Sequence, residues 1–230
     1  MKEYIKEAVL GMIAIITYFL LSEIELFPFN ALGIDVNSLP SFIKIAYLLI
    51  YEVMVISVML IIFNKKITKD FKDILLNHKE YYSKCMKYWL IGLVVMILSN
   101  SLLAIMSDGG IAGNEEALRE MFKFSPIYIY LSSIIYAPIV EELVFRQGIR
   151  NIFGRNMMFV IISGVVFGGL HVLTSATTTF DLLYLIPYSA LGISFAYMLY
   201  KTDNIFVSMG FHFMHNGILI AMQFIMLLFS

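Results

Sequence analysis

The sequence predicts an all-α integral membrane protein, a polytopic helical bundle of about seven transmembrane helices. Three observations predict this class: 60% of the 230 residues are hydrophobic, only 14% are charged, and the mean hydropathy is +0.84. A soluble domain is about half apolar and roughly one quarter charged, so this chain cannot cover itself with a polar surface. The composition also excludes disorder and a disulfide scaffold, and a net charge of −1 gives no indication of nucleic-acid binding.

Seven apolar runs follow one another along the chain, each close to the roughly 20 residues that a transmembrane helix needs. The first run follows Lys2 and Lys6 as a signal peptide would, but no small-x-small cleavage site precedes Glu23 and Glu25. We therefore expect a retained helix. The predicted spans are Ala8–Leu26, Ser41–Phe63, Met86–Met106, Ile127–Ile152, Met157–Leu173, Leu182–Tyr200 and Ile205–Phe229.

The basic residues predict the orientation of these spans. With the N-terminus in the cytoplasm, the cytoplasmic segments hold 13 of the 16 Lys and Arg residues, and the other side holds Lys44, Arg119 and Lys123. Lys and Arg concentrate on the cytoplasmic side of membrane proteins. The sequence thus predicts a multi-pass protein of the cell membrane with a cytoplasmic N-terminus.

Two polar segments connect the spans. Asn64–Lys84 is rich in Lys and is interpreted as an ordinary cytoplasmic loop, with a docking surface for anionic lipid or an acidic substrate as the alternative. Asp108–Pro126 contains Asp-Gly-Gly followed by Asn-Glu-Glu, which predicts a turn and then a short, capped surface helix.

Polar side chains inside the apolar runs mark the candidate functional site. A charge at the centre of a bilayer costs roughly 3 kcal/mol or more, so such residues are rare without a role. The candidates are Glu52, Glu141, Glu142, Arg146, His171, His212, His215 and Asn216.

Glu141 and Glu142 are adjacent in an apolar helix, so their side chains point about 100° apart and cannot serve one role equally. Glu142 and Arg146 are spaced i,i+4 and share a face, so Arg146 is expected to keep Glu142 ionised and in place. Glu141 then faces elsewhere and is free to act as a general base for water. The alternative is a helix end at which both acids reach interfacial water.

Two later motifs add nitrogen donors and acceptors. Two glycines precede His171 and leave room for close helix approach, and His171 is either catalytic or an interhelical hydrogen bonder. His212 and Asn216 share a helix face, and both can donate hydrogen bonds to a developing oxyanion. His215 lies three residues after His212, but no HExxH pattern supports a zinc peptidase.

The helical rise of 1.5 Å per residue places these groups at overlapping depths. Glu141 and Asn216 are about 16 Å from the cytoplasmic ends of their spans, His171 about 21 Å and His212 about 10 Å. The site is therefore expected in the cytoplasmic half of the bundle.

Two further expectations follow from this placement. Arg146, Arg150 and Arg155 are expected to flank a cytoplasmic mouth and to attract a substrate carboxylate. Glu52, also about 16 Å deep, is expected to pair with Arg146 or a histidine, or to line the path of water.

Three motifs in this order, Glu141-Glu142-xxx-Arg146, Phe167-xxx-His171 and His212-xxx-Asn216, resemble the signature of the CPBP family. This family comprises the CAAX proteases and bacteriocin-processing proteins, also called the Abi family. The resemblance covers about Tyr130–Ile220, whereas the first three helices match only in being hydrophobic. It divides the chain into N-terminal helices and loops with three spans (residues 1–126) and a CPBP/Abi-like catalytic core of four spans (residues 127–230).

The resemblance implies an intramembrane endopeptidase in which Glu141 and His171 activate water while His212 and Asn216 stabilise the oxyanion. Glu142 belongs to this catalytic set as the residue that supports the site. The implied substrate is a membrane-associated or lipid-anchored peptide or protein, either of CAAX type or a peptide pheromone or bacteriocin. The expected partners are this substrate and the lipid bilayer, without nucleic acid. The expected structural or supporting residues are Arg146, Phe167, His215 and Glu52.

Three alternatives stay open from the sequence. One is a non-enzymatic bacteriocin self-immunity or membrane binding protein, in which the polar cluster only holds the bundle together. Another is a small transporter with Glu141 and His171 as a proton relay, although no inverted repeat is evident. The third concerns the cofactor: none is expected, but a divalent metal such as zinc would have Glu141, His171 and His212 as ligands.

Overall fold

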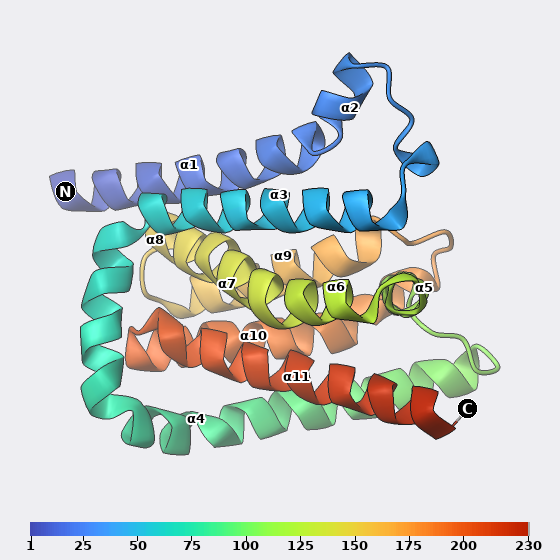
Figure 1. The fold of residues 1–230 in the computed structure, drawn as a ribbon. Helices are drawn as coiled ribbons and strands as arrows, with labels where there is room; N and C mark the ends of the chain where they lie inside the picture. The colour runs from blue at the N-terminus through green and yellow to red at the C-terminus, as the bar shows by residue number, and fades with distance from the viewer. Residues whose placement is uncertain (230) are drawn as a thin grey trace.

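The computed structural model describes residues 1–229, apart from the side chains of Asn37 and of residues 227–229, and every regular element in this part is a helix (Figure 1). Among the described residues, 6 helices are long and apolar enough to cross a membrane, and a shorter apolar helix, Met157–Leu173, lies between the fourth and fifth of them. The predicted all-α, multi-pass membrane fold is therefore confirmed.

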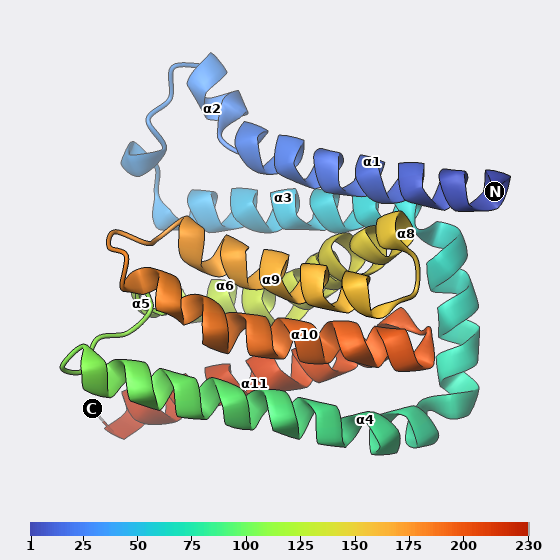
Figure 2. The same ribbon diagram turned by 180° about the vertical axis from the view of Figure 1, so that it is seen from behind.

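The long helices run side by side and alternate in direction, so every connection lies at one of two ends of the bundle (Figures 1 and 2). One end, which we call the basic end, holds the N-terminus, the first part of α4 and the connections α8–α9 and α10–α11. The opposite end, the α5 end, holds α2, α5 and the end of α11. The elements outside the fourth span are α1 (Lys2–Ile24), α2 (Phe27–Ala31), η1 (Val36–Ser38), α3 (Ser41–Ile62), α4 (Asn64–Met106), α5 (Gly113–Phe124), α9 (Met157–Leu173), η4 (Asp181–Tyr184), α10 (Leu185–Thr202) and α11 (Ile205–Phe229).

The segment Asn64–Lys84, expected as a loop, is helical and forms the first part of the 43-residue helix α4. This part crosses the basic end before α4 turns to run along the bundle (Figure 2). Asp70 and Ile74, one helical turn apart, are buried, whereas Phe71 and Leu75 are exposed. The loop prediction was wrong because this spacing gives the lysine-rich segment one inward face.

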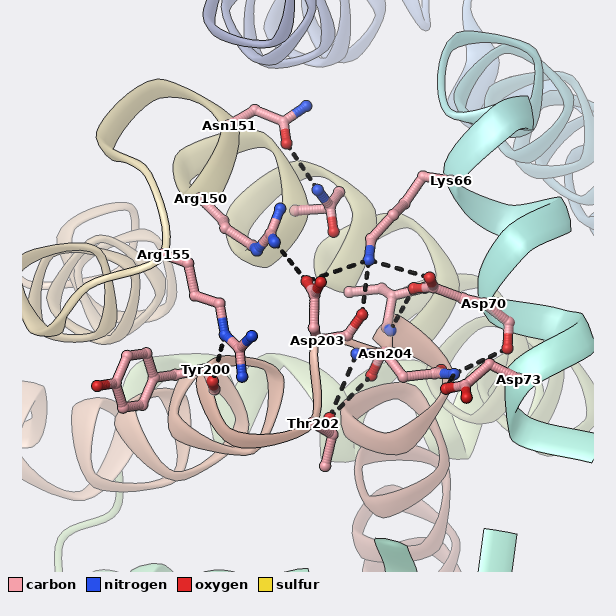
Figure 3. Close-up of polar contacts among 12 residues, drawn as sticks. Lys66, Asp70, Asp73, Arg150, Asn151, Arg155, Tyr200, Thr202, Asp203 and Asn204 are labelled. Atoms are coloured by element: carbon pink, nitrogen blue, oxygen red, sulfur yellow. Dashed lines mark hydrogen bonds and ion pairs between the residues drawn. The ribbon is translucent and has the colours of Figure 1, made fainter. Parts of the chain in front are cut away.

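A polar network fastens the first part of α4 to the α10–α11 connection (Figure 3). The Asp70 carboxylate accepts a hydrogen bond at 2.8 Å from the backbone N–H of Ile205, the first residue of α11. The Asn204 amide donates to the Asp70 carbonyl and to the Asp73 carboxylate, both at 2.8 Å. A carboxylate from α4 therefore satisfies an N–H at the start of α11 that has no partner within its own helix.

The arginines expected around the mouth of the site have other partners. Arg150 forms an ion pair with Asp203 in the same network (Figure 3). Arg155 donates hydrogen bonds to two backbone carbonyls near the end of α10, at 2.7 and 3.1 Å. Arg146 is fully buried in the interior. The expectation of an arginine-flanked cytoplasmic mouth was therefore wrong, because these side chains brace the fold.

The predicted span Ile127–Ile152 is one continuous helix of mixed winding. The α-helical segments are α6 (Pro126–Leu131), α7 (Ala137–Glu141) and α8 (Ile149–Phe153), and the π-helical segments between them are η2 (Ser132–Tyr136) and η3 (Glu142–Gly148). π-helical turns are rare and occur frequently at functional sites. The winding changes between Glu141 and Glu142, at the pair that the sequence singles out.

The predicted turn and helix after the third span are present, but the helix lacks the expected side-chain cap. Asp108 and Gly109 have left-handed backbones, with φ of 51° and 93°, and α5 follows. The expected cap was wrong: Ala112 is the N-cap residue without a side-chain hydrogen bond, and Asn114 instead donates to the Tyr188 hydroxyl at 3.2 Å.

Helices α9 and α10 pack closely through glycine. A Cβ atom on Gly168 would lie 2.9 Å from the backbone nitrogen of Ser189 in α10, closer than real Cβ atoms approach. On the neighbouring Gly169 it would meet only a Leu173 methyl group, at an ordinary 3.6 Å. The close approach predicted from this glycine pair is thus confirmed for Gly168 alone.

We expect Gly168→Ala to force α9 and α10 apart and to destabilise the protein by about 1–3 kcal/mol, because the added methyl group meets backbone. Thermal unfolding of the purified protein in detergent measures this effect. Gly169→Ala, the matched control, is expected to unfold at the wild-type temperature. Equal midpoints for the two variants would contradict the packing described here.

Candidate active site

A cavity of about 650 Å³ lies between the second half of α4, α5, the segments η2 and α7, α9, α10 and α11. It brings together residues that are far apart in the sequence. Six of the predicted site residues line it: Glu141, Phe167, His171, His212, His215 and Asn216.

Glu142 and Arg146 lie behind the cavity wall, and both side chains are fully buried. The Arg146 Nε atom is 3.3 Å from Glu142 Oε1, so the i,i+4 ion pair expected from the spacing forms. The same carboxylate oxygen lies 3.1 Å from His212 Nδ1. Glu142 therefore joins Arg146 on its own helix to His212 on α11.

Glu141 points the other way and lines the cavity, with its side chain 18% exposed. Its Oε2 atom is 3.8 Å from His212 Nε2. The His212 ring therefore lies between the two glutamates, with Nδ1 against Glu142 and Nε2 towards Glu141. The adjacent acids have the separate environments that their angular separation predicts.

Phe167 is the hydrophobic contact that the charged groups share. The Arg146 guanidinium lies 4.2 Å from the centroid of its ring, a cation–π contact, and the His171 ring lies 4.4 Å away. The His212 ring meets Phe167 edge to face at 5.9 Å. One aromatic side chain thus supports a buried cation and both imidazoles, which explains the four-residue spacing of Phe167 and His171.

His171 is held by its own helix and by α10. Its Nδ1 atom is 2.9 Å from the Phe167 carbonyl oxygen, and its ring stacks on Tyr188 at 5.0 Å. A carbonyl oxygen only accepts, so this contact assigns the proton to Nδ1 and leaves the Nε2 lone pair free. His171 is therefore placed in the cavity wall as a hydrogen-bond acceptor.

Asn216 contacts the first π-helical segment. Its Nδ2 atom donates a hydrogen bond to the Ser133 carbonyl oxygen at 2.8 Å. An amide carries two N–H groups, and the second remains for a molecule in the cavity. The local π winding of η2 thus contributes the carbonyl that orients this side chain.

Glu52 lies apart from this site, contrary to the expected pairing with Arg146 or a histidine. It accepts a hydrogen bond from the Tyr128 hydroxyl at 3.1 Å. It lines a separate cavity of about 210 Å³ together with Glu25. Ser132 and Tyr136 line both cavities, so Glu52 is a neighbour of the site and not part of it.

Two aromatic residues of α10 that the sequence did not single out also contact the site histidines. The fully buried Phe195 ring stacks on His212 at 4.9 Å with an interplanar angle of 20°, and Tyr188 stacks on His171. The two aromatics are seven residues apart, two helical turns, and therefore lie on one face. The spacing of these two residues could have indicated their shared face from the sequence. Aromatic residues are common in apolar helices, however, so the spacing alone does not mark a site.

No group of three or more His, Cys, Asp or Glu side chains in the described part of the chain is arranged to hold a metal ion. Glu141, His171 and His212, the ligands considered for a metal, are thus not gathered as a ligand set. His215 lines the cavity beside Phe195, with ring centroids 6.4 Å apart.

Comparison with known proteins shows which family the site segment is similar to. The family model described as type II CAAX prenyl endopeptidase Rce1-like matches residues 123–218. The chain is similar to "Putative membrane peptidase YdiL" of Bacillus subtilis (strain 168), with 34% identity over 116 residues, or 48% of this chain and 43% of that protein.

A second similar protein is "UPF0177 protein YvdC" of Lactococcus lactis subsp. lactis (strain IL1403), with 25% identity over 133 residues, or 56% of this chain and 49% of that protein. The chain thus spans just under half the length of the curated relatives that it matches. No solved structure is significantly similar to it. The matched segment contains all three signature motifs, and over residues 123–218 the chain is similar to the type II CAAX prenyl endopeptidase Rce1-like family.

Proposed function

We propose that this protein is an intramembrane endopeptidase that hydrolyses a peptide bond in a membrane-associated or lipid-anchored peptide or protein. The single observation that carries the proposal is that Glu141, His171, His212 and Asn216, from three different helices, line one cavity inside the apolar bundle. The family match and the peptidase relative support the reaction class.

In this mechanism, water binds between the Glu141 carboxylate and the free Nε2 atom of His171. Glu141 takes a proton from the water as the oxygen attacks the scissile carbonyl carbon. The tetrahedral intermediate then collapses, the C–N bond breaks, and the proton passes from Glu141 to the leaving amine. A carboxylic acid product and an amine product result.

His212 and Asn216 stabilise the negative charge on the carbonyl oxygen. The second amide N–H of Asn216 is one donor, and His212 Nε2 is the other. His212 Nδ1 faces Glu142 and its Nε2 atom faces Glu141 at the cavity, where a protonated Nε2 can donate to the carbonyl oxygen. Glu142 and Arg146 act through His212 and are positioning residues.

We further propose that hydrolysis needs no metal ion, because a carboxylate base and two nitrogen donors already provide proton transfer and charge stabilisation. We expect the purified enzyme to keep its activity after exhaustive treatment with a chelator. Cleavage of the substrate before and after chelation, with zinc or magnesium added back, tests this. Loss that one divalent ion restores would overturn it.

Glu141→Gln removes the base while keeping the shape of the side chain, so cleavage should fall by about 100-fold or more. The assay compares peptides in membranes and culture medium from wild-type and variant cells, where the substrate should accumulate uncut. Glu52→Gln, the same change at a buried glutamate of the neighbouring cavity, is the matched control and should process normally. Normal processing by Glu141→Gln protein of wild-type abundance would exclude Glu141 as the base and favour a non-enzymatic immunity or binding role.

Glu142→Gln leaves Arg146 as an uncompensated buried charge and should destabilise the protein by about 3–5 kcal/mol. The double variant Glu142→Gln/Arg146→Met removes both charges and should regain most of this stability. It should not regain activity, because His212 still lacks its charged partner. Unfolding in detergent and substrate cleavage distinguish these effects; recovery of both by the double variant would contradict the positioning role.

A further inference from the structure

The cavity extends from the middle of the bundle towards α5, away from the predicted cytoplasmic side. Its lining residues on α4 run from Met96 to Ala104 in the later part of that helix, and those on α11 extend to Gln223. The cavity is also lined by the 110–112 connection and by α5, which lie at the α5 end (Figures 1 and 2). Glu141 and Asn216 lie near the middle of their helices and His171 lies near the α5 end of α9. The expectation of a cavity that reaches the cytoplasmic side was wrong because the cavity extends from these residues towards the α5 end.

The rim of the cavity at the α5 end is polar. The Glu115 carboxylate accepts hydrogen bonds from Arg119, one turn further along α5, at 2.9 Å and from Gln223 of α11 at 3.3 Å. The Arg119 side chain is 48% exposed. Asn114, Glu115 and Arg119 all line the cavity. A polar, partly exposed rim is suited to the passage of a peptide.

The path from Glu141 towards the basic end is closed by packed apolar side chains. Val144, Leu199, Ile205 and Met209 belong to one cluster of buried residues, and the first three have no exposed surface. Beyond them, the network of Asp70, Asn204 and Asp203 ties α4 to the α10–α11 connection. Among the described residues, none that lines the cavity lies at the basic end, so the structure shows no route to it from there.

The charges identify the two sides of the membrane. The elements at the α5 end carry three basic residues, Lys44 at the start of α3 and Arg119 and Lys123 on α5, whereas nearly all other Lys and Arg residues belong to elements at the basic end. Eight acidic residues belong to the elements and connections at the α5 end: Glu23, Glu25, Asp35, Asp108, Glu115, Glu116, Glu120 and Asp181. By the positive-inside rule the basic end faces the cytoplasm, so the α5 end faces outwards.

We propose that the cavity opens on the extracytoplasmic side and that the enzyme cleaves a peptide bond presented there. This inference rests on the proposed protease function and narrows its substrate class. The substrate is an exported peptide or the outward-facing segment of a membrane-anchored protein. The cytoplasmic C-terminal tail of a prenylated protein does not fit, because it would reach the closed basic end.

Single cysteines test this proposal in a Cys85→Ala background, since Cys85 is the one natural cysteine and is buried. Leu118→Cys lies on α5 in the cavity lining, and Glu116→Cys lies exposed on the same helix outside it. Lys69→Cys lies exposed at the basic end. Intact cells are treated with a bulky, membrane-impermeant maleimide, and labelling is compared with that of permeabilised cells.

Leu118→Cys and Glu116→Cys should be labelled in intact cells, and Lys69→Cys only after permeabilisation. The readout is processing of the peptide that accumulates uncut in Glu141→Gln cells. Labelling of Leu118→Cys protein should abolish this processing, and labelling of Glu116→Cys protein should leave the processing unchanged. Labelling of Lys69→Cys alone in intact cells, or unchanged processing by labelled Leu118→Cys protein, would overturn the proposal. If Glu141→Gln cells accumulate no uncut peptide, the protease function fails, while the labelling pattern still decides which side α5 faces.

Discussion

The buried ion pair between Glu142 and Arg146 is the constraint on which the rest of the site depends. A single charge in the middle of an apolar bundle is unfavourable by several kcal/mol unless an opposite charge compensates it. Arg146 is compensated by Glu142 on its own helix and by the face of Phe167 on α9. Glu142 is in turn shared with His212 on α11. Three helices must therefore pack in one register to keep these charges buried.

This arrangement also separates the roles of two adjacent, chemically identical residues. Glu142 is fixed by Arg146 and His212, whereas Glu141 has a partly exposed carboxylate in the cavity. The π-helical segment begins at Glu142, so the backbone winding changes between the two acids. In the proposed mechanism, Glu142 has a fixed structural role while Glu141, which reaches the cavity, exchanges the proton; their different burial and partners allow this division.

Local patterns in the sequence predicted much of this site. Hydropathy located the spans, and i,i+4 spacing predicted both the Glu142–Arg146 pair and the shared face of His212 and Asn216. The sequence did not reveal the partners of Glu52, the stacking of Phe195 on His212 or the direction in which the cavity opens, because these depend on contacts between distant helices. The helix in Asn64–Lys84 was missed because its lysines outweigh the buried positions Asp70 and Ile74, and Asp70 binds Ile205, 135 residues further along the chain.

The two ends of the molecule thus differ in construction as well as charge. At the basic end, Asp70 binds the first N–H of α11, and Asp203 is bound by Lys66 and Arg150, so the connections there are fixed to one another. At the α5 end, the rim is held by exposed contacts such as Glu115 with Arg119, which contribute little to stability. Segments with few buried contacts open most readily. Movement that admits a substrate is therefore expected at α5, while the fixed basic end keeps Glu142, Arg146 and His212 in register.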